Sequence, residues 1–347
     1  MGERAIDRWK IVTDFVREHD VSDISLCGDS LTARMDGQIV RLSEAGALSK
    51  EVVSEMIREL LRFNPELVRT MSKPMASVDF TLELFERRFR INVARTRGEL
   101  FASLRPLPEM APEPAAIGLS SQLIKVVTEA SGGLVLITGP TGSGKTTTIA
   151  SLVDEINRSK QAKIITIEDP IEFNFKSKKA EIIQREIGLD SRSYEQGLRE
   201  ALRQNPDVIV IGEIRDAETS IVALQAAETG HLVIGSLHAN SVVDAIIRYL
   251  LLCPKERSTE MRYVLAKTLR VVTNQRLLRR RGGGRIAVRE ICIHAPNVEA
   301  VIIRGNEHEL AGYMLAGREA GMVDFLTALK SVQHLVDPAD YQLFSKQ

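Results

Sequence analysis

The sequence has few cysteines and aromatic residues and no excess of either charge. Of its 347 residues, three are cysteines and 5% are aromatic, and 46 Lys and Arg balance 46 Asp and Glu. The cysteines (Cys27, Cys253 and Cys292) stand far apart, which excludes a zinc ribbon or a disulfide framework and is typical of a reducing compartment. Zero net charge argues against a strongly basic nucleic-acid binder, so we expect no direct nucleic-acid partner.

Long apolar runs are also missing. No run approaches the roughly 20 residues that a membrane helix needs, and the charged start MGERAIDRWK lacks the apolar segment of a signal peptide. We therefore expect a cytoplasmic protein that meets membranes only through partners. The 44% hydrophobic and 27% charged residues are typical of a globular protein, and the length suggests two or three domains.

Residues 1–105 are predicted to form a small α+β domain. Apolar residues at positions 6, 9, 12 and 16 have helical spacing, and Asp36-Gly37 is a typical hairpin turn. Ser49 is a candidate cap for a second helix with Val52, Met56 and Leu60 on its apolar face. The predicted strands are 23–26, 31–35, 38–42, 77–84, 88–94 and 100–104.

Four prolines between Pro106 and Pro114 mark a domain boundary, because proline fixes φ and removes a backbone donor. We predict a short, stiff linker over 106–117 and a second domain over 118–347. In that domain apolar strands alternate with helices, which favours a parallel sheet covered on both faces. The predicted strands are 133–138, 163–167, 208–211 and 232–236, and the predicted helices are 145–156, 194–203 and 217–228. After about residue 255 the pattern looks mainly helical, interrupted at 279–285.

A glycine-rich segment between a predicted strand and a predicted helix matches the phosphate-binding pattern G-x-x-x-x-G-K-[ST]. Its candidate nucleotide-binding residues are Gly139, Pro140, Thr141, Gly142, Ser143, Gly144, Lys145, Thr146 and Thr147. Glycines let backbone N–H groups turn toward phosphate oxygens, and the helix N-terminus adds partial positive charge. Lys145 is expected to reach the β- and γ-phosphates of ATP and the Thr146 hydroxyl to bind Mg²⁺. The alternative is a chance glycine-rich turn.

Carboxylates follow two other predicted strands. Glu213 comes after an apolar strand and Gly212, so it is the candidate for holding or polarising the attacking water; the alternative is a surface glutamate. Glu168 and Asp169 repel each other unless a metal, lysine or arginine holds one of them. Glu168 is expected to organise Mg²⁺ or water, unless this segment only caps a loop before Pro170.

Two histidines bracket the last predicted strand. His231 and His238 are seven residues apart, which places their side chains on opposite faces and argues against a metal pair. One is a candidate sensor of the γ-phosphate and the other a brace for the strand. Each has the plain alternative of a structural histidine.

These segments resemble the hexameric type II/type IV secretion ATPases, and among them most the type IV pilus retraction (twitching-motility) motors. The matching segments are GPTGSGKTT (139–147), TIEDPIEF (166–173), DVIVIGEIRD (207–216) and TGHLVIGSLHA (229–239). They correspond to that family's Walker A, aspartate-box, Walker B and histidine-box motifs. Weaker likeness continues through SDISL (22–26), MDGQIVRL (35–42), RFRINV (88–93), QREIGLD (184–190) and GGGRIAVREI (282–291).

The resemblance implies a PAS-like N-terminal domain followed by a RecA-like ATPase domain. It implies a homohexameric ring at the inner face of the cytoplasmic membrane, bound there to a platform protein of a pilus or secretion machine. It also implies that arginines of the N-terminal domain approach the phosphates of ATP. The matching positions are Arg90 and Arg105, with Arg97 as a third candidate. Their alternative is ordinary arginines on a strand face.

Two departures from the family bear on the direction of the motor. The chain has no four-cysteine zinc insertion, which favours the retraction branch over extension motors. Residues 296–304, PNVEAVIIR, lack the first arginine of the segment that retraction motors carry, which leaves the direction open. A DNA-translocating ATPase, a small-molecule kinase and a non-catalytic subunit are further alternatives. The basic turn of Arg279, Arg280, Arg281 and Arg285 is either a solvated hairpin or a contact for a partner or nucleotide.

Overall fold

The structure is a computed structural model that describes residues 3–35, 38–42, 48–73 and 75–345. The predicted turn at Asp36-Gly37 lies outside these ranges. The chain forms two compact units, one of residues 1–110 with 172–174 and one of residues 111–171 with 175–347. The boundary between Met110 and Ala111 falls inside the predicted linker. No helix of the described part is long and apolar enough to cross a membrane.

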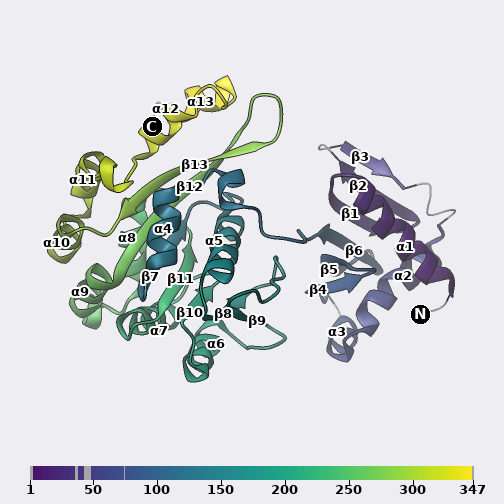
Figure 1. Cartoon of the computed structure of the whole chain (residues 1–347). Helices are drawn as coiled ribbons and strands as arrows, with labels where there is room; N and C mark the ends of the chain where they lie inside the picture. The colour runs from purple at the N-terminus through teal and green to yellow at the C-terminus, as the bar shows by residue number, and fades with distance from the viewer. Residues whose placement is uncertain (1–2, 36–37, 43–47, 74, 346–347) are drawn as a thin grey trace. The chain divides into compact units, whose positions relative to one another are not determined.

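The first unit is a six-stranded antiparallel sheet packed against helices (Figure 1). Its elements are α1(Glu3–Glu18), β1(Val21–Cys27), β2(Ser30–Met35), β3(Gln38–Arg41), α2(Lys50–Arg62), α3(Pro65–Met71), β4(Val78–Leu84), β5(Arg87–Thr96) and β6(Glu99–Pro106). The strand order is β3-β2-β1-β6-β5-β4, and α2 packs on the central strands β1 and β6. The core holds Trp9 from α1, Met56 and Leu60 from α2, and Ile24 and Leu104 from the sheet. The predicted α+β fold is confirmed.

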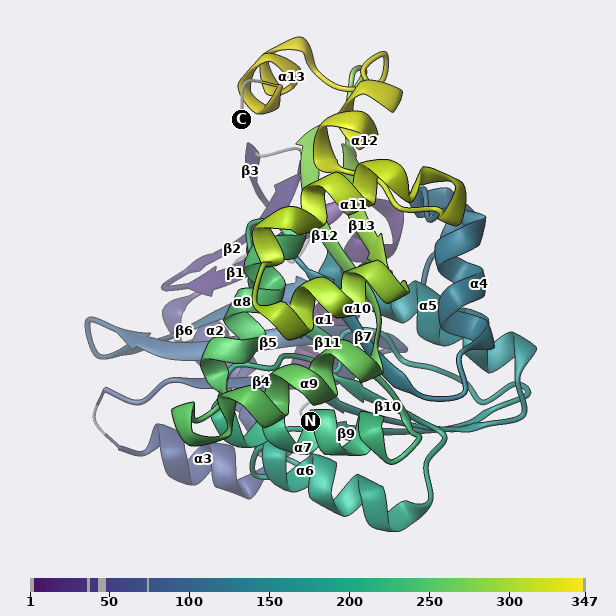
Figure 2. The ribbon, with the colours of Figure 1, turned by 90° about the vertical axis from the view of Figure 1, so that its left-hand side faces the viewer.

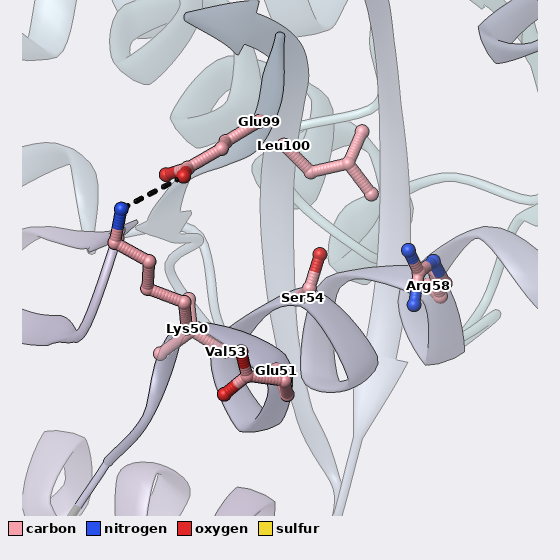
Figure 3. A pocket seen from close by; sticks show the side chains of 8 residues that line it. Lys50, Glu51, Val53, Ser54, Arg58, Glu99 and Leu100 are labelled. Atoms are coloured by element: carbon pink, nitrogen blue, oxygen red, sulfur yellow. Dashed lines mark hydrogen bonds and ion pairs between the residues drawn. The ribbon is translucent and has the colours of Figure 1, made fainter. Parts of the chain in front are cut away.

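A small pocket lies in this unit beside the start of α2 (Figure 3). Its volume is about 250 Å³, and its lining carries both signs of charge. The Lys50 ammonium donates to the Glu99 carboxylate at 2.9 Å, and this contact raises the pKa of Lys50. Part of the lining charge is therefore already paired within the unit.

The second unit is a seven-stranded sheet with helices on both faces (Figures 1 and 2). The strand order is β13-β12-β7-β11-β10-β8-β9, parallel except for β13. The strands are β7(Gly133–Thr138), β8(Lys163–Glu168), β9(Glu181–Glu186), β10(Val208–Ile211), β11(Leu232–Leu237), β12(Leu269–Arg279) and β13(Arg285–Ile293). The predicted parallel sheet and the α/β class are confirmed.

Helices lie on both faces of this sheet (Figure 2), and α6(Tyr194–Ala201) packs against β8 and β10. One face carries α4(Ser121–Glu129) and α5(Lys145–Ser159), and the other carries α7(Ala217–Glu228), α8(Val242–Leu252) and α9(Ser258–Thr268). The remaining helices are η2(Pro114–Ile117), η3(Leu202–Gln204), η4(Lys255–Arg257), α10(Pro296–Arg304), η5(Glu307–Glu309), α11(Leu310–Ala316), η6(Arg318–Ala320), α12(Phe325–Ser331) and α13(Pro338–Phe344).

The expectation of a mainly helical chain after residue 255 is wrong for residues 269–293. These residues form the antiparallel hairpin β12–β13, and the chain becomes helical again from Pro296. β12 lies between β7 and β13 and is buried on both faces, so it has no alternating pattern. Its apolar run is interrupted by Thr273, Asn274 and Gln275, which are at most 1% exposed. The edge strand β9 was also not predicted.

The end of the β12–β13 hairpin is bound to the C-terminal helices. The Arg279 guanidinium donates to Asp340 of α13 at 2.7 Å, and Arg276 lies over the rings of Phe325 and Phe344. Arg281 donates to the backbone oxygen of Val336 at 2.9 Å. Arg279 and Arg281 of the predicted basic turn therefore have partners within this unit, while the turn itself is exposed.

Candidate nucleotide-binding site

The strand order brings the four motif segments to one edge of the second sheet. Strands β7, β11, β10 and β8 are consecutive neighbours, and each motif follows or ends one of them. Their parallel register pairs Leu237 with Thr138, and Ile211 with Ile167 and Gly235. The residues after these strands therefore lie side by side at the carboxyl edge, where parallel sheets bind ligands.

The glycine-rich loop has the strand–loop–helix context that phosphate binding requires. Gly139, Gly142 and Gly144 all have positive φ, at 147°, 74° and 85°. A Cβ atom at Gly139 would fall on the backbone oxygen of Gln275, so only glycine fits there. The loop ends at the N-terminus of the 15-residue helix α5, whose unpaired N–H groups and dipole favour a phosphate.

The side chain of Lys145 folds back over the glycine-rich loop that precedes it. Its ammonium donates to the backbone oxygens of Gly139 at 2.9 Å and Pro140 at 3.1 Å, and it lies 3.5 Å from Nδ1 of His238. Burial lowers the pKa of Lys145, and the nearby Glu213 carboxylate opposes that shift. Phosphate oxygens are stronger acceptors for this ammonium than the loop carbonyls are.

Glu213 connects the lysine side of the site to the aspartate box. Its carboxylate lies 3.3 Å from Nε2 of His238 and 3.8 Å from the Arg215 guanidinium. Arg215 in turn pairs with Asp169 at 3.3 Å and lies over the Tyr194 ring. Arg215 and His238 therefore hold the Glu213 carboxylate in position. The Glu213 side chain is 27% exposed, so it is still open to water.

The Glu168 side chain is held by polar residues of β8 and β9. Its Oε1 accepts hydrogen bonds from the Thr166 hydroxyl at 2.6 Å and from the Gln184 amide at 3.1 Å. The other member of the acidic pair, Asp169, is held by Arg215, which is the arrangement that the repulsion between adjacent carboxylates requires. The two carboxylates are thus separated by different partners.

The structure brings His238 to the loop but not His231. His231 precedes β11, at the amino end of the strand, and its Nδ1 lies 3.0 Å from the backbone oxygen of Ala226 and 3.2 Å from the Thr229 hydroxyl. Within this unit it braces the turn that leads into the strand. The prediction of a catalytic role for His231 gains no support from this placement, whereas His238 lies between Lys145 and Glu213.

The predicted arginines belong to the first unit. Arg90 on β5 and Arg105 on β6 are directly paired across the two strands, so they share one face of the sheet. Arg90 donates to Asp79 at 2.8 Å and Arg105 to Asp23 at 3.0 Å, which offsets the repulsion between the two guanidinium groups. Arg97 is exposed in the β5–β6 turn with a φ of 50°.

Polar residues of β12 support the loop, and sequence reasoning missed them. The Gln275 amide donates to the backbone oxygen of Ser143 at 2.7 Å. Asn274 donates to the Thr138 hydroxyl and to the Ala239 oxygen, each at 3.0 Å, and so connects the ends of β7 and β11. The polar triplet inside an apolar run was the available sign, because buried polar groups need partners.

No group of three or more His, Cys, Asp or Glu side chains able to hold a metal occurs in the described ranges. Thr146, the residue predicted to bind Mg²⁺, lies in the first turn of α5.

Comparisons with known proteins agree with this geometry. The family of type II/IV secretion system proteins matches residues 115–282. Uncharacterized protein YggR of Escherichia coli is 37% identical over 320 residues, 92% of this chain and 95% of its own. The type IV pilus retraction ATPase PilT of Pseudomonas aeruginosa is 35% identical over 320 residues, 92% of each chain.

Among solved structures, the pilus retraction motor PilT with bound ADP has a TM-score of 0.88 at 37% identity, covering 96% of this chain and 95% of that one. This likeness spans nearly the whole of both chains and includes both units of the fold. The resemblance inferred from the motifs is confirmed, and the chain belongs to the type II/type IV secretion ATPase family.

Proposed function

We propose that this chain is a Mg²⁺-dependent ATP hydrolase that drives pilus retraction as a homohexameric motor. The observation that carries the proposal is the line of contacts Lys145–His238–Glu213 at the mouth of the glycine-rich loop. These contacts hold the Lys145 ammonium and the partly exposed Glu213 carboxylate at the same edge of the sheet, which supports a site that binds phosphate beside an activated water. The full-length likeness to the retraction ATPase supports the choice of machine.

The residues divide into a phosphate cradle and a water-activating group. Backbone N–H groups of residues 141–147 and the Lys145 ammonium bind the β- and γ-phosphates. Glu213 accepts a hydrogen bond from the attacking water and draws its proton as the water attacks the γ-phosphorus. His238, between Glu213 and Lys145, responds to the γ-phosphate, and Glu168 orders water beside it. The products are ADP and phosphate.

Thr146 is the residue that would hold Mg²⁺, together with phosphate oxygens. Mg²⁺ prefers hard oxygen ligands and usually keeps several waters, which fits a site with one hydroxyl ligand and no preformed cage of acidic residues in the described part. When bound, the ion neutralises charge that develops on the phosphates.

A motor for pilus extension or for secretion is the second candidate. Relatives named type II secretion system protein E match only part of this chain, for example 44% of it in Xanthomonas campestris, whereas the retraction ATPase matches 92%. This difference in coverage favours retraction. The partners we propose are further copies of the chain and a platform protein at the inner face of the cytoplasmic membrane.

A deletion strain separates these candidates. If the chain retracts pili, cells lacking it display surface pili that no longer shorten, and the wild-type gene restores shortening. Loss of surface pili would instead assign extension, and unchanged pili with lost export would assign secretion. The purified protein must also hydrolyse ATP in the presence of Mg²⁺, and its failure to do so would reject the whole proposal.

A further inference from the structure

A buried arginine lies behind the phosphate-binding loop. Arg289, on β13, is 6% exposed. Its guanidinium donates to the Gln275 amide oxygen at 3.3 Å and to the Thr148 hydroxyl at 3.3 Å. It also donates to the backbone oxygens of Ile117 at 2.8 Å and Gly118 at 3.4 Å. All these acceptors are neutral, and burial lowers the pKa of Arg289 to about 10.

This arrangement is unusual for a buried charge, because buried arginines are normally paired with carboxylates. The guanidinium N–H groups instead donate to neutral polar groups and orient them. Two of those groups, on Gln275 and Thr148, lie around the loop, and two belong to residues 117–118, where the predicted linker ends. The side chain thus connects three parts of the second unit that are distant in sequence.

Gln275 connects Arg289 to the loop, because it contacts both Arg289 and Ser143. Its amide oxygen accepts from both Arg289 and Thr148, at 3.3 and 2.9 Å, so its amide nitrogen is turned toward the Ser143 oxygen at 2.7 Å. Thr148 belongs to α5, one turn after Lys145. One guanidinium therefore sets the orientation of an amide that supports the loop backbone.

We propose that Arg289 is a positioning residue for the nucleotide site. Through Gln275 and Thr148 it keeps the loop in the shape that binds phosphates, and it ties that shape to residues 117–118. The inference deepens the proposed ATP hydrolysis and rests on it. The competing explanation is that Arg289 only fastens β13 to the core.

Arg270 offers a matched control for the competing explanation. It lies on β12 and donates to the backbone oxygen of Gly132 at 2.8 Å, just before β7 begins. That contact is at the amino edge of the sheet, opposite to the loop. An Arg270→Gln substitution therefore removes a comparable structural contact without touching the loop.

The experiment measures nucleotide affinity and turnover of the full chain carrying Arg289→Gln, Arg289→Lys or Arg270→Gln. A fluorescent ATP analogue gives Kd, and steady-state hydrolysis gives KM and kcat. We expect Arg289→Gln to raise Kd and KM about tenfold, the usual effect of losing hydrogen bonds from a charged group. Its kcat should change much less, because Glu213 and Lys145 are intact. Arg270→Gln should keep the wild-type Kd.

Arg289→Lys distinguishes geometry from charge. Lysine keeps the charge but lacks the planar fork, so we expect its Kd to stay as weak as that of Arg289→Gln. Wild-type affinity in either Arg289 variant, or an equal loss in Arg270→Gln, would overturn the inference. Absence of hydrolysis in the wild-type protein would instead reject the proposed function.

If Arg289→Gln does not fold, Thr148→Val decides the question. This substitution is close to isosteric and removes the hydroxyl that contacts both Arg289 and Gln275. A rise in Kd supports the inference, and an unchanged Kd in a folded Thr148→Val protein overturns it.

Discussion

At the scale of single residues, the two ends of α5 carry lysines in similar surroundings. Lys145 donates to the Gly139 oxygen and Lys160 to the Ala130 oxygen, each at 2.9 Å, and burial lowers the pKa of both. Only Lys145 faces the loop. We expect Lys145→Ala to reduce ATP hydrolysis by at least about 10²-fold, because the charge that meets the phosphates is lost.

Lys160→Ala is the control for this substitution. It removes the lysine at the C-cap of the same helix, which has a similar backbone contact, so its turnover should remain close to wild type. Steady-state release of phosphate measures both variants. Equal activity of the two would show that the position of Lys145 at the loop is not what matters for hydrolysis.

The role we propose for Glu213 is to act on water and not on the phosphate cradle. Glu213→Gln keeps the size of the side chain but removes the acceptor for the proton, so hydrolysis should fall about 10²–10⁴-fold, the usual share of a general base. ATP binding should persist because residues 139–147 are unchanged. Equilibrium binding and single-turnover hydrolysis, compared with Glu195→Gln on the surface of α6, test this. Near-normal turnover in Glu213→Gln would remove Glu213 from the proposed mechanism.

At the scale of elements, the loop depends on its contact with β12. In Gly139→Ala the new methyl group meets the Gln275 backbone oxygen at a positive φ, so we expect a loss of more than about 1 kcal/mol in the free energy of unfolding. Gly142→Ala has the same kind of strained φ with no atom within 4 Å of the added Cβ. It should lose less stability. Denaturant unfolding of both variants measures the difference, and equal losses would show that the close approach to β12 is unimportant.

The elements that the sequence predicts correctly are those that a local pattern of residues determines. β7 and α7 have the predicted bounds, and the glycines of the loop have the positive φ that phosphate binding needs. β12 escaped prediction because its polar triplet is buried by contacts with segments more than 30 residues away. The short helix α3 was missed although Asn64 caps it and Pro65 opens it, since seven residues carry little periodicity.

The candidate site shows the same limit. Glycines and the order of motifs identified the loop, and the ends of the predicted strands identified Glu168, Glu213 and His238, which the strand order then brings to one edge. The spacing of the histidines predicted different faces but could not tell which of the two lies beside Lys145. The contacts of Gln275 and Arg289 could not be assigned from the sequence, because they join segments that are distant along the chain.

At the scale of the whole molecule, the proposed ring makes activity depend on assembly. If hydrolysis requires neighbouring copies, specific activity should rise with protein concentration and level off once the ring is complete. Light scattering across the same range should show the mass approaching six copies. Constant specific activity from a monomer would contradict the proposed hexameric motor.

The last prediction concerns the two paired arginines of the first unit. The family resemblance assigns Arg90 and Arg105 to the phosphates, and their cross-strand pairing places both on one face. If they stabilise charge on the phosphates, Arg90→Ala and Arg105→Ala should bind ATP through Lys145 yet hydrolyse it poorly. Arginine fingers contribute about 10³–10⁵-fold in other P-loop enzymes. Arg→Lys should not restore turnover, because lysine lacks the guanidinium fork.

The ion-pair partners of these arginines provide the control. Asp79→Ala and Asp23→Ala break the same two ion pairs but leave the guanidinium groups in place. A purely structural role predicts equal losses in the aspartate and arginine variants, whereas a role at the phosphates predicts lost turnover only when the arginine is removed. Exposed ion pairs contribute at most about 1 kcal/mol, so the aspartate variants should remain folded. Normal hydrolysis by both arginine variants would confine Arg90 and Arg105 to the stability of the first unit.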